Sequence, residues 1–358
     1  MKAAVCRQFG APLTLEPLSL ADPTGHELKI RIKACAICHS DISYIKGYWG
    51  GNLPMIFGHE AAGVIEAVGD AVTGFRPGDR VVVTLMRSCG TCPSCLDNME
   101  AICATPPAIT SPSHQAASEV IQPSMNTGAF AEEVLVHERQ CIAIPDDLDF
   151  ETASLLGCGV ITGFGAVFRV GNVKSGDRVG VIGSGGIGIN AIQAARIAGA
   201  STIIAMDASS AKRDLALDLG ATHFLNVLED DVAVAVDEAT GGEKLDMVFV
   251  AVGVAKAIEN ALPLIRRAGK VVILGMPASD DLARIDASSL ASSAQCIIGT
   301  KMGSAMIRED IPHLIGLFQE GKIALDRLIS HRYPFEDINT AIEMAADPSS
   351  ARVVLTFD

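Results

Sequence analysis

Four of the ten cysteines in this chain of 358 residues fall in one short stretch. They form the pattern Cys89-x-x-Cys92-x-x-Cys95-x7-Cys103. Four thiolates at this spacing are typical of a closed tetrahedral zinc site, in which sulfur occupies every coordination position and no substrate can bind. The alternative is four buried or disulfide-paired cysteines, which such close spacing disfavours in a large chain without a secretory signal. The pattern therefore predicts a structural zinc site.

Further residues of metal-ligand type are spread over a longer stretch. They occur in the segments Cys38-His39-Ser40-Asp41, Gly58-His59-Glu60 and Leu155-Leu156-Gly157-Cys158-Gly159. A catalytic zinc takes three protein ligands and keeps a fourth position open. Each residue alone has a structural explanation, because a single Cys is usually an inert small side chain and a single His is usually hydrogen-bonded. As a set, Cys38, His59 and Cys158 predict a catalytic zinc site.

A glycine-rich turn indicates a third site. The segment Gly183-Ser184-Gly185-Gly186-Ile187-Gly188 follows an apolar run and precedes a helical pattern. Its first glycine permits a tight turn, the second lets the backbone approach a pyrophosphate, and the third lets the helix pack against the strand. Asp207 ends the next predicted strand, where a carboxylate can bind an adenosine ribose and repel a 2′-phosphate. The turn and Asp207 together favour NAD over NADP, although an Asp ahead of Ser209 could instead cap a helix.

The elements that must position these residues change character along the chain. As far as about Glu151, short β-branched runs at 29–33, 62–68 and 80–84 predict a loop-rich all-β lobe. A Pro/Ser/Thr-rich segment at 105–128 has no clear period, and we expect a mobile loop there. From residue 176, strands alternate with helices, which predicts parallel βαβ units. The predicted strands are 179–182, 202–206, 224–227, 247–252 and 270–274. One predicted helix follows the glycine-rich turn and ends at 198, and two others span 209–219 and 256–265. A helix at 308–320 and a strand at 352–357 then complete the first lobe.

Composition excludes several classes of protein. The formal charge is −14, so the chain is a poor ligand for the phosphate backbone of a nucleic acid. No apolar stretch approaches the ~20 residues that a membrane-spanning helix needs. The N-terminal residues lack the layout of a secretory signal. We therefore expect a soluble cytoplasmic protein with two domains and with neither nucleic acid nor membrane as a partner.

The five motifs, in this order along the chain, resemble the zinc-containing medium-chain alcohol dehydrogenase family, which is part of the medium-chain dehydrogenase/reductase group. The resemblance implies an α/β protein with a GroES-like β-barrel catalytic domain and a doubly wound parallel-sheet Rossmann domain. It implies a catalytic domain at 1–159 with a structural-zinc lobe at about 88–104, an NAD-binding domain at 160–298, and a return to the catalytic domain at 299–358. It also implies a homo-dimer or homo-tetramer that binds a small-molecule alcohol or aldehyde, NAD(H) and two zinc ions per subunit.

The resemblance assigns roles to individual residues around the catalytic zinc. Cys38, His59 and Cys158 match the zinc ligands, and Glu60 lies next to the metal. Asp41 matches the carboxylate that orients the His59 ring. Zinc is expected to act as a Lewis acid, while Ser40 takes the proton of the alcohol and hydride passes to nicotinamide.

The resemblance also assigns cofactor and substrate residues. His39 and Arg352 match basic residues near the pyrophosphate, and Lys212 matches an adenosine-ribose lysine; the alternative for all three is a solvated surface charge. Trp49 falls where small-alcohol members have a pocket-lining aromatic, so we expect primary alcohols and aldehydes as substrates. A tryptophan of the core or the pocket rim is the alternative.

One position departs from the family pattern. Many relatives carry a proton-relay histidine five residues after the first ligand, and this chain has Ser43 there. Ser43 could hold a water, Lys46 could reach in, or the proton could leave from the cofactor ribose. The four cysteines without a role are expected to be buried. They are Cys6, Cys35, Cys141 and Cys296.

Three other functions compete with this interpretation. A glutathione-dependent formaldehyde dehydrogenase would share both zinc sites, although nothing obvious marks a pocket for an anionic thiol adduct. A zinc-free quinone or enoyl reductase is disfavoured by the predicted ligands. A non-catalytic nucleotide or redox sensor is compatible with the four cysteines but gives no purpose to an open three-ligand site.

Overall fold

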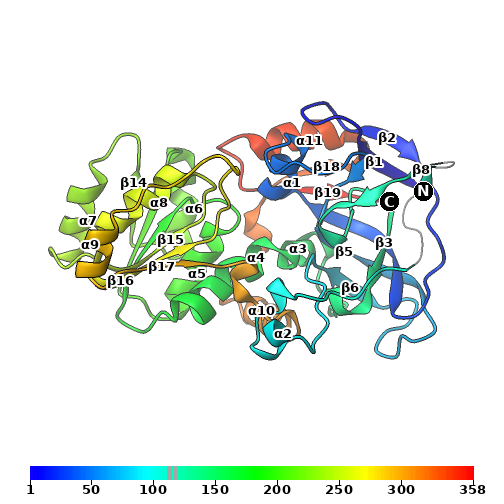
Figure 1. Ribbon diagram of the computed structural model, residues 1–358, viewed down its shortest axis with the longest axis horizontal. Coiled ribbons are helices and arrows are strands. Elements are labelled where there is room, and N and C mark those ends of the chain that lie inside the picture. The colour runs from blue at the N-terminus through cyan, green and yellow to red at the C-terminus, as the bar shows by residue number, and fades with distance from the viewer. Residues whose placement is uncertain (111–114, 117–118) are drawn as a thin grey trace. The chain divides into compact units, whose positions relative to one another are not determined.

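The computed structural model describes residues 1–110, 115–116 and 119–358, which form two compact units (Figure 1). Unit 1 contains Met1–Cys158, Met306–Gly316 and Leu325–Asp358. Unit 2 contains Gly159–Ala305 and Leu317–Ala324. The chain therefore passes from unit 1 to unit 2 directly after Cys158.

Unit 1 consists mainly of strands. They are β1 (Lys2–Cys6), β2 (Thr14–Pro17), β3 (Glu27–Ala36), β4 (Met55–Ile56), β5 (Glu60–Val68), β6 (Arg80–Val83), β7 (Gln115–Ala116), β8 (Glu119–Val120), β9 (Gln122–Pro123), β10 (Glu133–His137), β11 (Cys141–Ala143), β18 (Ile329–Pro334) and β19 (Arg352–Thr356). The larger sheet has the order β11-β6-β5-β3-β19-β18, and β10 pairs with β3 as well. A second sheet has the order β2-β1-β4-β9, and β7 and β8 form a two-stranded sheet.

The long strand β3 organises the larger sheet. It pairs antiparallel with β5, β10 and β19. Leu28, Ile30 and Ile32 alternate along it and are fully buried in the core of unit 1, as the period of a strand requires. Because Val354 of β19 lies opposite Ala36, the start of β19 is beside the end of β3. The sheet thus brings a late segment of the chain next to the first predicted metal ligand.

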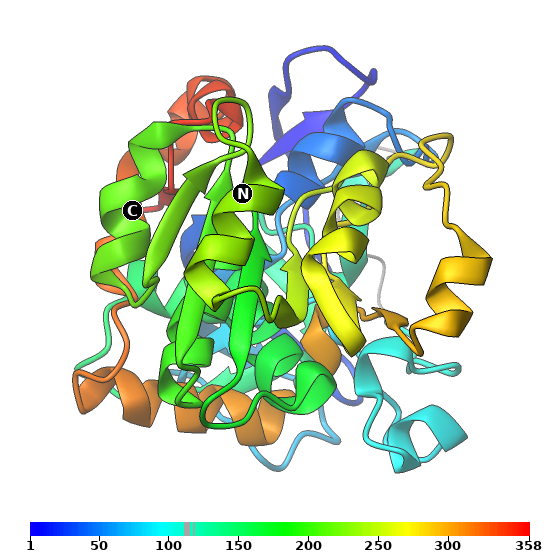
Figure 2. The same cartoon turned by 90° about the vertical axis from the view of Figure 1, so that its left-hand side faces the viewer.

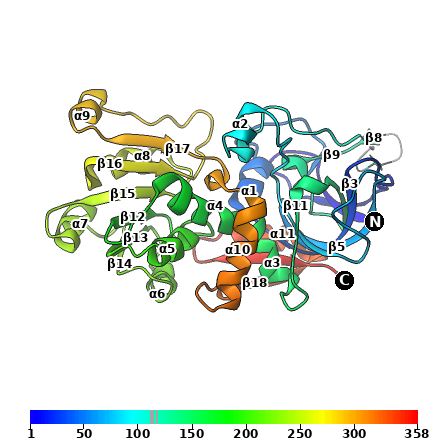
Figure 3. The same ribbon diagram turned by 90° about the horizontal axis from the view of Figure 1, so that it is seen from below.

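Five helices of at least four residues belong wholly or mainly to the described part of unit 1. They are α1 (His39–Ile45), α2 (Pro93–Leu96), α3 (Phe150–Ser154), α10 (Ile307–Gln319) and α11 (Ile338–Ala346). The helix α2 lies to one side of the strands of unit 1 (Figure 3). It carries part of the four-cysteine segment, which forms a lobe of its own.

Unit 2 contains a six-stranded parallel sheet in the order β14-β13-β12-β15-β16-β17. The strands are β12 (Arg178–Ile182), β13 (Thr202–Asp207), β14 (His223–Asn226), β15 (Leu245–Val250), β16 (Ile265–Ile273) and β17 (Cys296–Gly299). The helices are α4 (Gly159–Gly165), α5 (Gly188–Ile197), α6 (Arg213–Asp218), α7 (Val232–Thr240), α8 (Ala255–Ala261) and α9 (Ala287–Ser292). Helices lie on both faces of the sheet (Figure 2). This confirms the predicted doubly wound parallel fold.

Several helical segments differ from the sequence prediction, and two of them have a clear local cause. The helix predicted at 256–265 ends at Ala261, because Pro263 follows in a short 3-10 turn and Ile265 already begins β16. The helix α7 was not predicted, because its Val-Ala-Val-Ala-Val sequence alternates as a strand would. Asp231 caps it by accepting a hydrogen bond from the Val234 N–H.

The segment predicted as a mobile loop at 105–128 contains the short strands β7, β8 and β9. Residues 111–114 and 117–118 lie outside the described residues, and the mobility of this segment stays a prediction. Within the described ranges, no single helix has the length and apolar character needed to cross a membrane. The bent pair Phe150–Gly157 and Gly159–Gly171 meets that test only when its two pieces are joined.

Candidate functional site

A single buried carboxylate positions the first two predicted zinc ligands. Cys38 caps the N-terminus of α1, and its N–H donates to Oδ2 of Asp41 at 3.1 Å. The other oxygen, Oδ1, accepts from the Gly58 N–H at 2.9 Å and lies 3.0 Å from His59 Nδ1. Asp41 is fully buried. It therefore fixes the helix start, the following turn and the orientation of the His59 ring together.

The turn before His59 requires glycine. Gly58 has a φ of +89°, and a Cβ there would lie 2.6 Å from the backbone N of Phe130. Any other residue would meet both the left-handed conformation and this backbone atom. The turn leads directly into His59 and into Glu60, which lies opposite Ala36 at the end of β3.

Four residues whose side chains can each ligate a metal ion lie together in the interior of unit 1. The ligand atoms of Cys38, His59, Glu60 and Cys158 all lie within 4.8 Å of one another, and all four residues are buried. His59 Nε2 has no hydrogen-bond partner in the described part of the chain. A buried nitrogen is rarely left without a partner, and two sulfurs with one imidazole nitrogen form a set that zinc prefers. The two sulfurs and the imidazole nitrogen thus fit a zinc ion, and Glu60 supplies a fourth possible ligand atom.

Electrostatics prepare one of these sulfurs to bind a cation. The pKa of Cys38 is lowered well below its usual value, first by its hydrogen bond with Cys158 and also by the neighbouring His59. The thiolate is the form that ligates metal. A thiolate is therefore favoured within the pair of Cys38 and Cys158.

Glu60 carries an ion pair that sequence reasoning did not find. The Arg352 guanidinium at the start of β19 donates to Glu60 Oε2, and both side chains are buried. Burial raises the pKa of Glu60 to about 8, and the positive charge of Arg352 opposes that rise. We expected Arg352 near a pyrophosphate, and the structure places it on this carboxylate, 292 positions away in sequence.

The remaining predicted residues around α1 differ in exposure. Ser40 Oγ lies 3.7 Å from Cys38 Sγ and is half-buried, so a hydroxyl is available next to the cluster. His39 is exposed at the first position of the helix. Ser43 is half-buried, whereas Lys46 is exposed at the helix end. The structure therefore brings Ser40 to the cluster and leaves the route of the proton beyond it open.

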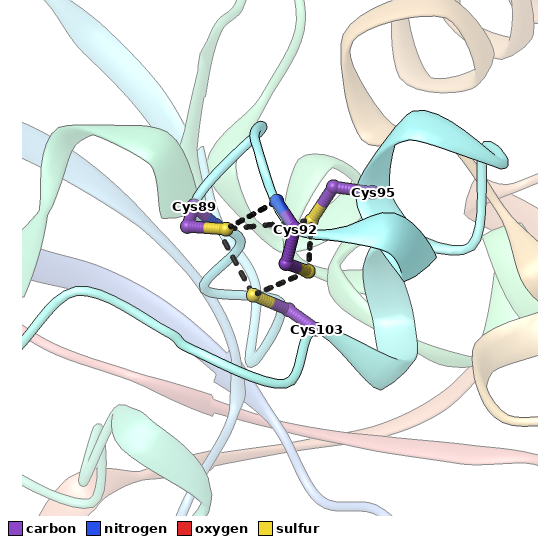
Figure 4. A group of neighbouring side chains, drawn as sticks. All are labelled: Cys89, Cys92, Cys95 and Cys103. Carbon is purple, nitrogen blue, oxygen red and sulfur yellow. Dashed lines mark hydrogen bonds between the residues drawn. The ribbon is translucent and has the colours of Figure 1, made fainter.

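The sulfur atoms of the four-cysteine segment point toward one another (Figure 4). Cys92 Sγ lies 3.5 Å from Cys95 Sγ and 3.9 Å from Cys103 Sγ, and Cys89 Sγ lies 3.9 Å from Cys95 Sγ. Sulfurs bound at about 2.3 Å around a tetrahedral zinc are separated by about 3.8 Å. All four cysteines are free thiols. The cluster fits a closed zinc site and not a pair of disulfides.

Two threonines support Cys89 and were not predicted. The Thr105 hydroxyl lies 3.3 Å and the Thr91 hydroxyl 3.6 Å from Cys89 Sγ, which also accepts from the Cys92 N–H at 3.2 Å. The hydrogen bond from Thr105 is the largest of the causes that lower the pKa of Cys89 to about 5. Each threonine lies two residues after a cysteine of the cluster, Cys89 or Cys103. This spacing could have identified both threonines from the sequence.

The glycine-rich turn of unit 2 has the geometry of a nucleotide-binding turn. It connects the end of β12 to the start of α5. A Cβ at Gly188 would lie only 1.7 Å from the carbonyl oxygen of Gly183, so the helix can approach the turn only at glycine. A Cβ at Gly185 would meet no described atom within 4 Å, which leaves its backbone approachable from outside.

Asp207 connects this turn to the next strand. Its Oδ2 accepts from the Ser184 N–H at 2.6 Å, and its Oδ1 accepts from the Ser209 N–H at 2.9 Å. Lys212 Nζ lies 3.6 Å from Oδ2. The N-cap of the following helix α6 is Lys212, so Asp207 does not cap that helix. The structure thus brings Asp207, Lys212 and the turn together.

Of the four cysteines without a role, three are buried as predicted: Cys6, Cys35 and Cys141. The prediction is wrong for Cys296, which is exposed. It begins β17, the edge strand of the parallel sheet, where only one side of the strand is paired.

Comparison with known proteins agrees with this geometry. Residues 24–146 match the family of the alcohol dehydrogenase GroES-like domain, and residues 186–320 match the zinc-binding dehydrogenase family. The chain is 35% identical to the NDMA-dependent alcohol dehydrogenase of Amycolatopsis methanolica, over 99% of this chain and 98% of that protein. It is 33% identical to the S-(hydroxymethyl)glutathione dehydrogenase of Saccharomyces cerevisiae, over 99% and 96%.

A solved structure shows the same likeness over its full length. The alcohol dehydrogenase zinc-binding domain protein of Burkholderia ambifaria superposes with a TM-score of 0.94 at 34% identity, and the match covers 100% of this chain and 98% of that one. These matches confirm the GroES-like and Rossmann folds and the redox chemistry between alcohol and aldehyde. The chain belongs to the zinc-containing medium-chain alcohol dehydrogenase family.

Proposed function

We propose that this alcohol dehydrogenase oxidises primary alcohols with NAD as hydride acceptor and holds two zinc ions per subunit, one in each cluster. The observation that carries the choice of NAD is the position of Asp207, whose carboxylate is fixed against the glycine-rich turn at Ser184. A carboxylate at this place accepts hydrogen bonds from the ribose 2′-hydroxyl and repels a 2′-phosphate. Lys212, beside it, would then contact the same ribose.

We call the group of Cys38, His59, Glu60 and Cys158 the mixed cluster. The mechanism assigns tasks to its two cysteines and its histidine, and to two neighbouring residues. Cys38, His59 and Cys158 would hold a zinc ion, which when bound supplies a Lewis acid for the substrate oxygen. Asp41 keeps the His59 ring oriented so that Nε2 faces the metal position. The Ser40 hydroxyl, close to Cys38 Sγ, accepts the proton that the alcohol loses and at the same time donates its own proton onward to water or to the cofactor ribose. Loss of this proton prepares the carbinol carbon to release hydride.

Steady-state kinetics with NAD and with NADP test the cofactor. We expect kcat/KM to be higher with NAD, because a 2′-phosphate would lie against Asp207. The variant Asp207→Ser removes the negative charge and keeps a hydrogen-bonding group, so it should lose most of this preference. Equal or better activity of the wild-type enzyme with NADP would overturn the proposal.

The acceptor itself needs a separate measurement, since the Amycolatopsis relative is named for its dependence on NDMA. Alcohol oxidation is followed with added NAD alone, with NDMA alone and with both. Turnover with NAD alone supports NAD as a free substrate. Turnover only in the presence of NDMA would contradict it.

A second candidate activity comes from the similarity to the yeast S-(hydroxymethyl)glutathione dehydrogenase. The chain would then oxidise the adduct of formaldehyde with glutathione. Formaldehyde oxidation with and without added glutathione distinguishes the two. Activity on primary alcohols that is independent of glutathione favours our proposal, and a strict requirement for glutathione favours the second candidate.

A further inference from the structure

One arginine side chain ends at the turn between the first two cysteines of the four-cysteine segment. We call Cys89, Cys92, Cys95 and Cys103 the sulfur cluster. We infer that Arg139 is the counter-ion of the sulfur cluster when this cluster holds zinc, so that its positive charge helps to retain the metal. This inference rests on the proposed function, in which each cluster holds one zinc ion.

A zinc ion bound by four thiolates needs a counter-charge. The thiolates carry four negative charges and Zn²⁺ carries two positive ones, so the occupied cluster is a dianion. Cys92 and Cys95 are buried, each with only 8% of its surface exposed. Burying a charge is costly unless the charge is paired and hydrogen-bonded. The Thr105 hydroxyl and the Cys92 N–H give Cys89 hydrogen bonds, but they bring no positive charge.

The charged end of Arg139 lies at the Gly90 turn. A Cβ at Gly90 would lie 2.6 Å from Nη1, 3.0 Å from Nη2 and 3.1 Å from Cζ of Arg139. Glycine is required at this position because φ is +77° and because a side chain would displace the guanidinium group. The Gly90 backbone forms a hydrogen bond with Cys95, whose sulfur points into the cluster (Figure 4). A single residue therefore separates the positive charge from a ligand sulfur.

Two buried side chains hold the backbone that carries Arg139. The Arg139 N–H donates to His137 Nδ1 at 3.1 Å. The Gln140 amide donates to the Thr84 carbonyl at 2.9 Å and to the Asn126 carbonyl at 3.0 Å. His137 and Gln140 are both buried. Arg139 lies between them in sequence, so its side chain starts from a fixed position.

The Arg139 guanidinium group has no carboxylate partner within the described ranges. It forms neither an ion pair nor a side-chain hydrogen bond there. The acid next to it in sequence, Glu138, pairs with His26, whose Nδ1 lies 2.5 Å from Oε1. Arg87, which is half-buried like Arg139, donates to the Asn126 side chain at 3.0 Å. Arg139 is thus the arginine whose charge is available to the sulfur cluster.

The test measures how tightly the sulfur cluster holds its metal. Cobalt(II) replaces zinc in the enzyme, and its absorption distinguishes a site of four sulfurs from a site that includes nitrogen. Chelator titration at low ionic strength then gives the metal affinity of each cluster. Arg139→Gln removes the charge, so the sulfur cluster should bind metal about tenfold more weakly, while the mixed cluster is unchanged. Arg139→Met provides the same comparison if the glutamine variant is unstable.

Two further variants show whether the charge itself matters. Arg139→Lys keeps a positive charge and should lose no more than about threefold in affinity. Arg76→Gln is the matched control, because it removes the same charge from an exposed arginine of unit 1 that pairs with Asp79 at 3.4 Å. It should leave both affinities unchanged. An equal loss in Arg76→Gln and Arg139→Gln would overturn the specific role of Arg139.

Ionic strength separates an effect of charge from an effect of packing. The Debye length falls from about 30 Å at about 0.01 M salt to about 3 Å at about 1 M salt. The difference between the wild type and Arg139→Gln should therefore shrink from about tenfold to about threefold or less. A difference of the same size at both salt concentrations would mean that Arg139 acts through packing, and it would overturn the inference.

Elemental analysis of the wild-type enzyme separates this inference from the proposed function. If the wild type holds two zinc ions and Arg139→Gln retains both as tightly, the inference alone is overturned. If the wild-type sulfur cluster takes up no zinc, the proposal of two zinc ions fails, and the inference fails with it because there is no dianion to compensate.

Discussion

The two clusters that fit zinc differ in how far apart their ligands lie in sequence. The sulfur cluster uses residues 89–103 only, and its supporting hydroxyls come from the same segment. The mixed cluster joins Cys38, His59 and Cys158, and Glu60 next to them pairs with Arg352. A local cluster can form from one folded loop. A dispersed one requires β3, β5 and β19 to be paired first.

The two clusters also differ in whether their ligand atoms have hydrogen-bond partners. In the sulfur cluster each ligand is a thiol, and backbone N–H and threonine hydroxyl groups support Cys89. In the mixed cluster a buried nitrogen, His59 Nε2, and a carboxylate oxygen of Glu60 lack hydrogen-bond partners among the described residues. Unsatisfied buried polar atoms are costly, so they mark the cluster that has capacity for a ligand.

The largest expected effect is the loss of zinc from the mixed cluster alone. Cys158→Ala should lower the zinc content from two ions per subunit to one. Because a metal Lewis acid contributes several kcal/mol to catalysis, kcat/KM for a primary alcohol should fall by about a thousandfold or more. Elemental analysis and steady-state kinetics measure the two values. Cys141→Ala removes another buried cysteine and serves as control; full zinc content in Cys158→Ala would break the comparison.

Gly58→Ala should affect the mixed cluster through the backbone. The left-handed conformation and the clash with Phe130 together should reduce the free energy of unfolding by about 3 kcal/mol. Urea denaturation measures the change, and zinc should be lost from the mixed cluster first. At Gly10, φ is +75° and a Cβ meets nothing within 4 Å, so Gly10→Ala isolates the conformational part. Equal effects of the two variants would show that the clash with Phe130 is unimportant.

Asp41→Asn should have a smaller effect on the same cluster. The amide keeps the size of the side chain but removes the charge that orients and polarises His59. Loss of such a partner typically lowers metal affinity or activity by about 10- to 100-fold. Competition with a chelator measures zinc affinity at each site. The prediction fails if the sulfur cluster loses zinc to the same extent.

The smallest expected effect concerns the reactivity of two cysteines in the sulfur cluster. In the zinc-free protein, Cys89 has a pKa lowered to about 5 by hydrogen bonds, chiefly from Thr105, whereas burial raises the pKa of Cys95 to about 12. Cys89 is therefore a thiolate at about pH 6 and Cys95 is a thiol, and only the thiolate reacts with an alkylating agent.

Thr105→Val removes the hydroxyl, so the pKa of Cys89 should rise and alkylation at about pH 6 should slow by several-fold. Mass spectrometry of the zinc-free protein treated with iodoacetamide measures the rate at each cysteine. Thr105→Ser keeps the hydroxyl and should behave as the wild type. Faster alkylation of Cys95 than of Cys89 would contradict the assignment.

The same contrast explains what could be predicted from the sequence. The strands β12 and β13, the helix α5 and the glycine-rich turn were all predicted, because each has a strong local pattern of apolar runs, period and glycine spacing. The helices between 150 and 165 were missed, because nearly every residue there is buried and no polar face marks a helical period. The helix α7 was missed because its alternation imitates a strand.

In the candidate site, too, some features could be predicted from the sequence and others could not. The ligand types could be recognised from motifs and their order. The ion pair between Glu60 and Arg352 could not be predicted, because the local sequence around each residue does not identify the other. Only the pairing of β19 with β3 brings them together. The contact between Tyr44, Trp49 and Phe57 also depends on a loop conformation that no local pattern predicts.

The buried pair of Glu60 and Arg352 also has a consequence for how the enzyme matures on the ribosome. A chain is made from its N-terminus, and early segments fold first. The sulfur cluster has all of its ligands soon after residue 105 has left the ribosome. The carboxylate beside the mixed cluster gains its counter-ion only when residue 352 has been added and β19 has joined the sheet. Under the proposed function, the sulfur cluster can therefore bind its zinc ion during synthesis, whereas the mixed cluster reaches its final charge balance only after nearly the whole chain has been made.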